Sequence, residues 1–250
     1  MTLFATYFGS SGWLLQFEKI RVLVDPWLRG NLSFPPGPWL IEGKLTKTLD
    51  IPSEITIILL TQGLSDHAHS PSLDLFPRST RIVGSNSAIN VVRKLGFQSV
   101  FELSPGQIKT LDGLKIEATE GAAVPNLENG YLLSHDCGSI YIEPHGFLDQ
   151  KIPPQKIDAV ITPVVNIKLP FAGSFIQGKK VLPELIKRFQ PLTVLASTTG
   201  GDSMFTGILN RFMSVEGKTG NPLDGLSSEA NFIEPIPGIL YKLKTHQGIS

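Results

Sequence analysis

Short apolar segments, separated by polar, glycine-rich or proline-rich connections, recur along the whole chain. Their side chains are mainly β-branched, aromatic or leucine, and each segment has about the length of a typical strand, roughly five to six residues. The segments therefore predict strands, which are in order LFATYF, WLLQF, RVLVD, ITIILLT, RIV, SVFEL, LKIEAT, GYLLS, SIYIE, DAVITPV, LTVLAS and ILYKLK.

Helical spacing of apolar side chains occurs in three longer segments, residues 85–95, 179–189 and 202–213. Apolar positions three and four apart give each segment one apolar face, which is typical of a helix packed on a sheet. Serines at the start of the first segment and Gly96 after its end are suitable caps. A shorter helical piece is predicted over residues 71–76.

The order of these elements favours two sheets packed face to face with helices outside, because many strands precede the first helix and helices alternate with strands after it. The predicted fold class is therefore α/β or α+β. No linker divides residues 1–250, so we expect one domain. Glycine and proline cluster in two long connections, residues 27–40 and 163–178, whose aromatic residues either plug sheet edges or cover a site.

Charge and composition exclude several classes of function. The chain has 22 Lys and Arg against 22 Asp and Glu, so no net positive field attracts nucleic acid or an anionic membrane surface. Charged residues make up 18% and hydrophobic residues 41% of the chain, which fits a folded domain with a large core. The longest apolar run, Ile57 to Leu60, is far too short to span a bilayer, so we expect a soluble protein.

The single cysteine, Cys137, excludes an intrachain disulfide, and the first residues lack the basic start, apolar stretch and cleavage site of a signal peptide. Both features suit a reducing compartment, and we expect the cytoplasm. Cys137 lies in a tight turn where the sequence shows no base to activate its thiol, so no catalytic role is expected. His135 and His246 do not indicate a functional site either.

The most informative stretch for chemistry is the loop that follows the predicted buried strand at residues 55–61. Asp66, His67 and His69 lie within four positions, and imidazole and carboxylate groups are ligands of zinc and other divalent first-row metals. A loop after a buried strand also fixes the directions of these side chains. The alternative is that Asp66 caps the next turn while both histidines bond to backbone or solvent.

Six motifs, taken in their order along the chain, support a metal site. They are YFGSSGWLLQFEKIRVLVDPWL, DIPSEITIILLTQGLSDHAH, VGSNSAINVVRKLGF, LKIEAT, ENGYLL and SIYIEPHG. In this order the chain resembles the metallo-β-lactamase fold superfamily, and within it the UlaG-like branch of metal-dependent hydrolases. The resemblance covers about Thr2 to Ser197. It implies a four-layer αββα sandwich with a metal site at one rim, between the two sheets.

The motif that usually holds metal in that superfamily is altered here. Family members carry His-x-His-x-Asp-His after the core strand, where the first two histidines hold one zinc and the Asp-His pair holds a second. The corresponding residues are Gln62, Leu64, Asp66 and His67. Because Leu64 has no donor atom and Gln62 offers only a neutral amide, the first site cannot be assembled as in the family. We expect one zinc or other divalent ion per chain, or none.

The other ligands that the resemblance implies are altered too. Where a histidine usually follows LKIEAT, only Glu120 is near, and where a bridging aspartate usually follows SIYIE, the chain offers Glu143 or His145. The last histidine is replaced by a polar run ending in Asp202, which either reaches the ion or caps the next helix. Asp25, in VLVDPW, is expected to accept structural hydrogen bonds rather than bind the ion.

Asp66, His67 and His145 would suffice for a catalytic zinc, which keeps about three protein ligands and an open position. Glu143 and Asp202 are further candidate ligands. As the resemblance implies, the ion would activate water to cleave a small ester, lactone or phosphoester. Asp66 and His67 would be the catalytic residues, with Asp66 orienting the water or acting as general base.

The alternative function is a family member that has lost hydrolysis and binds a ligand or partner in the same cleft, roofed by Trp27, Phe34 and Trp39. We assign substrate binding to His69, Trp27 and Trp39, although His69 also fits an exposed turn before Pro71. The expected partner is a small-molecule substrate or ligand, with no nucleic acid and no membrane. Exposed strand edges are compatible with a homodimer.

Overall fold

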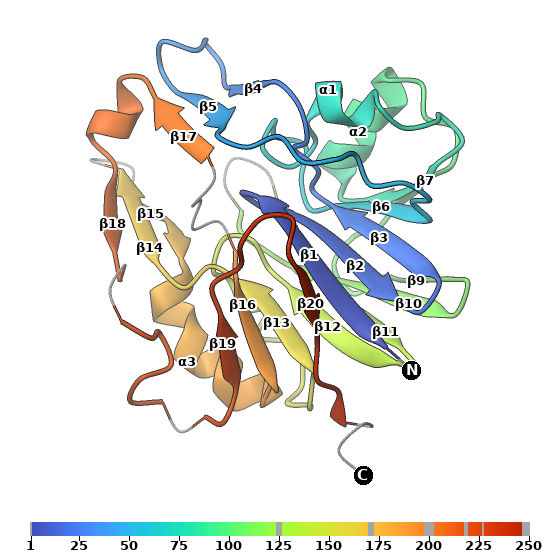
Figure 1. The fold of residues 1–250 in the computed structure, drawn as a ribbon, viewed down its shortest axis with the longest axis vertical. Coiled ribbons are helices and arrows are strands. Elements are labelled where there is room, and N and C mark those ends of the chain that lie inside the picture. The colour runs from blue at the N-terminus through green and yellow to red at the C-terminus, as the bar shows by residue number, and fades with distance from the viewer. Residues whose placement is uncertain are drawn as a thin grey trace.

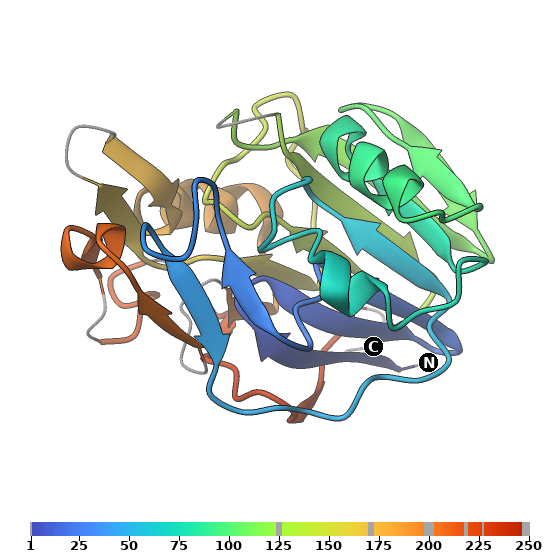
Figure 2. The ribbon, with the colours of Figure 1, turned by 90° about the horizontal axis from the view of Figure 1, so that it is seen from above.

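The computed structural model describes residues 2–123, 127–169, 173–197, 203–217, 220–226 and 228–246. The chain forms the four layers of an αββα sandwich, which confirms the predicted fold class (Figure 1). Two sheets pack face to face, with α1 (Ser70–Leu73) and α2 (Asn86–Lys94) outside the first and α3 (Gly178–Phe189) outside the second (Figure 2). These helices correspond to three of the four predicted helical segments.

Each main sheet has seven strands within the described residues. The first sheet, in its spatial order, contains β20 (Leu240–Lys242), β1 (Leu3–Gly9), β2 (Gly12–Phe17), β3 (Ile20–Val24), β6 (Ile57–Leu60), β7 (Arg81–Gly84) and β8 (Val100–Glu102). The second sheet, in its spatial order, contains β19 (Asn231–Ile233), β16 (Thr193–Ala196), β13 (Ala159–Thr162), β12 (Gly138–Ile142), β11 (Asn129–His135), β10 (Leu114–Glu120) and β9 (Ile108–Leu111).

Two three-stranded sheets within the described residues lie beside the sandwich. One contains β17 (Ser203–Thr206), β5 (Glu42–Leu45) and β4 (Asn31–Ser33), and the other contains β15 (Gly173–Gln177), β14 (Asn166–Leu169) and β18 (Ser214–Glu216). The two long connections of the sequence therefore supply strands of their own.

The helix predicted over residues 202–213 is wrong for the part of it that the structure describes. That part forms β17, a single 3₁₀ turn η1 (Leu209–Arg211) and the start of β18. Gly207 has a φ of 105°, which a helix interior does not allow, and a Cβ there would meet the Leu40 carbonyl oxygen at 2.6 Å. Pairing of β17 with β5 therefore outweighs the helical spacing of the apolar side chains.

The core explains why β6 is continuously apolar. Ile57 and Leu59 face the second sheet, whereas Ile58 and Leu60 face α1 and α2, so both faces of this strand are buried. Strand β6 pairs in parallel with β3 and β7, and a strand buried on both faces is typical of such positions. No helix of the described residues has the length and apolar character needed to cross a membrane.

Candidate metal centre

The candidate site lies at one rim of the sandwich, where strands of both sheets end. Asp25 follows β3, residues 61–67 follow β6, and residues 143–145 follow β12. Parallel pairing of β3 with β6 brings the first two strand ends together. Because β11 runs antiparallel to β12, Glu128, directly before β11, lies at the same rim. Ligands of open α/β sheets bind outside such carboxyl ends.

Hydrogen bonds between the two sheets set the distance across this rim. The Asn129 backbone N–H donates to the Thr61 carbonyl oxygen at 3.0 Å, and the Tyr131 hydroxyl donates to the Leu60 carbonyl oxygen at 3.0 Å. Glu128 immediately precedes Asn129 in the chain. These bonds therefore hold Glu128 opposite the loop that follows β6.

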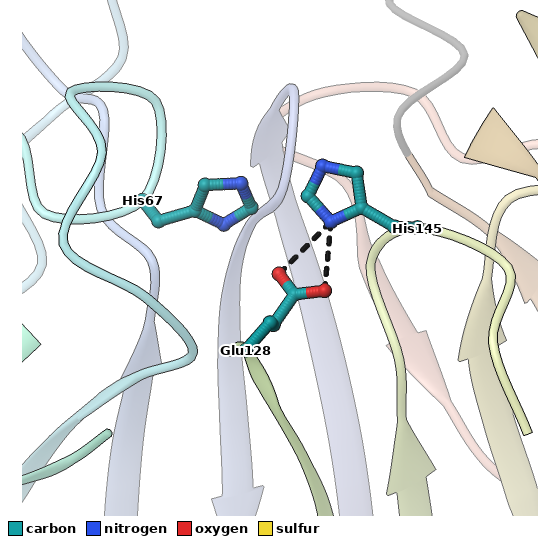
Figure 3. A group of neighbouring side chains, drawn as sticks. All are labelled: His67, Glu128 and His145. Atoms are coloured by element: carbon teal, nitrogen blue, oxygen red, sulfur yellow. Dashed lines mark hydrogen bonds and ion pairs between the residues drawn. The ribbon is translucent and has the colours of Figure 1, made fainter. Parts of the chain in front are cut away.

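Three side chains converge at this rim, His67, Glu128 and His145 (Figure 3). Their ligand atoms all lie within 4.8 Å of one another. The His145 Nδ1 is 2.9 Å from Oε1 and 2.8 Å from Oε2 of Glu128, and the two imidazole rings are 5.2 Å apart between centroids. His67 and Glu128 are buried, and only 12% of the His145 side chain is exposed.

Asp25 and Thr61 fix the orientation of His67. Asp25 Oδ2 lies 2.8 Å from the His67 Nδ1 and accepts the Thr61 hydroxyl at 2.6 Å, while Oδ1 accepts the Thr61 backbone N–H at 2.9 Å. With Nδ1 occupied in this way, Nε2 is the ring nitrogen left for an ion. Asp25 also has a φ of 40°, in the left-handed region that non-glycine residues adopt infrequently and that is found at many functional sites. It accepts structural hydrogen bonds, as the sequence predicts.

The charges around the two histidines favour a cation. Burial opposes protonation of His67, but the adjacent Asp66 and Asp25 carboxylates outweigh it and raise its pKa well above the usual value. Burial likewise opposes protonation of His145, and the Glu128 carboxylate outweighs it, so this pKa is raised too. Acidic groups at the rim thus stabilise positive charge on the histidines, and they would attract a divalent metal ion in the same way.

The donor set fits a metal ion on two grounds. First, two histidines and one glutamate form a set that catalytic zinc sites use. Second, the buried Nε2 of His67 makes no hydrogen bond within the described residues, although it is 3.3 Å from the Asp66 Oδ2. Native proteins rarely leave buried polar atoms without a hydrogen bond, so a ring nitrogen that has none among the described residues, beside a carboxylate and a second imidazole, suits coordination of an ion.

Asp66 and Glu143, both predicted ligands, lie around this group but outside it. Burial alone would raise the pKa of Asp66, but the neighbouring His67 outweighs burial, so the pKa is lowered. The Asp66 Oδ1 is buried and has no hydrogen-bond partner among the described residues. The Glu143 carboxylate accepts the backbone N–H groups of His145 at 3.1 Å and Phe147 at 2.7 Å. Burial and the nearby Glu128 raise the pKa of Glu143 to about 8. Glu143 therefore holds the loop that carries His145.

Glu128 is the member of this candidate group that the sequence interpretation did not name. The candidate named in its place, Glu120, has a side chain that is 39% exposed and pairs with Lys151 at 3.0 Å, so it is not part of the group. The available signal for Glu128 was a carboxylate directly before the apolar strand GYLL, where it becomes fully buried. Asp202, a further predicted ligand, lies outside the described residues.

The predicted substrate-binding residues fall into two groups. His69 is buried, with Nδ1 2.8 Å from the Ser72 hydroxyl and Nε2 3.3 Å from the Asn31 carbonyl oxygen, which leaves no ring nitrogen for a substrate in this conformation. Trp27 is fully buried beside His69 and donates to the Gly30 carbonyl oxygen. Trp39 is 58% exposed and Phe34 is half-buried, so these two remain available to a ligand.

The remaining histidines lie in other hydrogen-bonded settings. The His135 Nδ1 is 3.2 Å from the Cys137 sulfur, so this thiol does have a base beside it, in contrast to the sequence interpretation. Burial nevertheless raises the pKa of Cys137, which disfavours the reactive thiolate. The His246 Nδ1 lies 2.8 Å from Asp158, near the end of the described chain.

Comparison with known proteins agrees with this architecture. The family model of the beta-lactamase superfamily domain matches residues 5–197. A curated relative, the UPF0173 metal-dependent hydrolase of Paracoccus denitrificans, is 27% identical over 148 residues, which are 55% of this chain. A relative from Cereibacter sphaeroides is 26% identical over 147 residues. The matched region spans 60% of the length of each of these relatives.

Solved structures show the same fold over nearly the whole chain. A possible metal-dependent hydrolase from Veillonella parvula has a TM-score of 0.67 at 16% identity, covering 96% of this chain and 99% of that one. The metallo-beta-lactamase fold protein YhfI from Bacillus subtilis has a TM-score of 0.63 at 14% identity, covering 97% and 100%. The protein is thus of the metallo-β-lactamase fold class. The chain belongs to the beta-lactamase superfamily.

Proposed function

We propose that this chain is a hydrolase that uses one divalent metal ion, held by His67, Glu128 and His145. The observation that carries the proposal is the convergence of their ligand atoms within 4.8 Å, around a His67 nitrogen that lacks a hydrogen bond within the described residues. Two histidines and a glutamate leave a fourth position open in catalytic zinc sites, so we propose zinc as the ion.

A bound zinc ion supplies a Lewis acid and lowers the pKa of a coordinated water to about 7. Asp66 lies beside His67 and has a carboxylate oxygen free to accept a hydrogen bond, so we assign it to orienting the attacking water and accepting its proton. Asp25 keeps Nδ1 of His67 occupied and so directs Nε2 inward. Glu143 fixes the backbone that carries His145.

The proposed substrate is a small ester, lactone or phosphoester, the proposed contact for it is the exposed Trp39, and the proposed location is the cytoplasm. The names of the curated relatives, metal-dependent hydrolases, support the reaction type. The order of motifs supports placement within the UlaG-like branch. The chosen substrate class follows from the chemistry of activated water, which attacks carbonyl and phosphoryl centres.

Elemental analysis of protein purified without chelator tests the proposal, followed by a screen of esters, lactones and phosphodiesters. We expect about one zinc per chain, and we expect His67→Ala and His145→Ala to lose both the ion and turnover. The control is His135→Ala, which changes the last residue of β11, outside the candidate group. Metal content near zero after incubation with excess zinc would refute the proposal.

A second candidate function is binding of a ligand or partner without hydrolysis. It is favoured by Leu64, which supplies no donor atom, and by Gln62, whose amide is engaged by Glu128. In that case His67→Ala and His145→Ala would leave the protein folded and its ligand uptake intact, whereas Trp39→Ala would weaken uptake. Binding titrations with the same ester and lactone panel distinguish the two functions.

A further inference from the structure

Gln62 contacts the metal-binding group without belonging to it. Its side chain is buried at the end of the core strand β6, and its Nε2 donates to the Glu128 Oε1 at 3.1 Å. A carboxylate only accepts hydrogen bonds, so the amide NH₂ must be the end that faces Glu128. Glu128 thus dictates the orientation of the Gln62 amide.

This orientation leaves the other end of the amide unpaired. The Gln62 Oε1 is buried and has no hydrogen-bond partner within the described residues. A buried acceptor without a donor is costly, and an apolar side chain of similar size, such as methionine, would avoid that cost. A polar side chain at this position therefore indicates a requirement for its N–H donor toward Glu128.

The Glu128 carboxylate is held from both sheets. Gln62 contacts it from the end of β6, and the His145 Nδ1 contacts it from the loop after β12. An ion bound by Glu128 and His145 together would replace their mutual contact. The bond from Gln62 would remain, and it would then set the direction of the carboxylate.

We propose that Gln62 is a positioning residue of the ion site, which orients the Glu128 carboxylate for coordination through its Nε2 hydrogen bond. The inference rests on the proposed function, because it requires an ion at this group. It also gives Gln62 a role in a one-ion site, at the position where the sequence departs from the resembled motif. Groups that orient ligands typically change metal affinity about 10- to 100-fold when they are removed.

Titration with cobalt(II), whose visible absorption reports ligand geometry, tests this role in the chain of residues 1–250. The variant is Gln62→Met, which keeps the shape of the side chain and removes the donor. We expect Co²⁺ to bind about 10- to 100-fold more weakly than to the unchanged protein, with an altered visible spectrum. The melting temperature of the metal-free variant should not fall, because an unpaired buried acceptor is also removed.

The matched control is Gln16→Met, which removes an amide that accepts from Arg21 at 3.2 Å on the first sheet. It should leave Co²⁺ affinity and spectrum unchanged. A lower melting temperature of Gln62→Met with unchanged affinity and spectrum would overturn the inference, since Gln62 would then be merely structural. If that variant does not fold, Gln62→Leu is measured by the same criteria.

Absence of an ion site and absence of a role for Gln62 give different results in these titrations. If the unchanged protein binds no Co²⁺ and no Zn²⁺, the proposed function is refuted and the role of Gln62 with it. If the unchanged protein binds one ion and Gln62→Met binds it equally well, only the role of Gln62 is refuted.

Discussion

The Asp25 carboxylate lies 2.8 Å from Nδ1 of His67, and this contact decides which ring nitrogen of the histidine is available at the rim. Asp25 reaches His67 because β3 and β6 are parallel neighbours whose ends coincide. The same carboxylate accepts two hydrogen bonds from Thr61, so Thr61 fixes the orientation of the carboxylate that contacts the imidazole. Loss of a partner of this kind typically weakens metal binding about 10- to 100-fold.

We therefore expect Asp25→Asn to weaken zinc binding about 10- to 100-fold, because an amide has one acceptor oxygen and no charge, and cannot replace the two carboxylate oxygens that accept from Thr61 and contact His67. Competition with a coloured chelator measures the change. Asp158→Asn is the matched control, since Asp158 makes a comparable 2.8 Å contact with His246. Equal zinc affinities of the two variants would contradict the role given to Asp25.

Two glutamates provide a direct comparison between the sequence interpretation and the structure. We expect Glu128→Gln to lower zinc occupancy sharply, because it removes a buried anionic ligand of the group. Glu120→Gln should leave occupancy unchanged, since Glu120 forms an exposed ion pair of the kind that contributes about 0 to 1 kcal/mol. Metal analysis after dialysis against limiting zinc distinguishes them, and the reverse result would restore Glu120 as the ligand.

Zinc should stabilise the folded protein, because the ligand group exists only when both sheets are assembled. At a free zinc concentration 100 times Kd, we expect about 2.7 kcal/mol of additional stability. A thermal melt with and without zinc measures it. Calcium, which needs about six to eight oxygen ligands, should give no such shift, and His67→Ala should abolish the shift given by zinc. A zinc shift retained in His67→Ala would place the ion elsewhere.

The hydrogen bond of Tyr131 across the two sheets should contribute to stability as well as to the site. Its hydroxyl donates to the Leu60 carbonyl oxygen and accepts from the Asn129 side chain, both at 3.0 Å. Tyr131→Phe removes both of these buried hydrogen bonds, and we expect a loss of about 1 to 3 kcal/mol in urea unfolding. Tyr241→Phe is the control, because the Tyr241 hydroxyl accepts from the exposed Ile236 backbone. Equal losses would show that the bond between the sheets contributes nothing specific.

Local sequence patterns predicted the strands and helices whose burial depends only on their own periodic spacing of apolar side chains. The apolar run of β6 and the helical spacing of α2 and α3 gave the correct element types, because burial of one strand or one helix face leaves a periodic record in the sequence. The ordered motifs also led to the fold. His67 was named as a ligand because it follows the end of a core strand, and His145 because the resemblance places a ligand after SIYIE.

The sequence by itself thus determined the layers of the sandwich and the loops that carry its chemistry, whereas only the tertiary structure decided which acidic residue completes the group. Glu120 and Glu128 are eight positions apart in the sequence, and no periodicity separates a carboxylate in an exposed ion pair from a fully buried one. The difference arises from the bond between Asn129 and Thr61, which joins chain segments that are far apart. The same holds for β17, where pairing with β5 overrides a helical pattern, because pairing between distant strands leaves no local record.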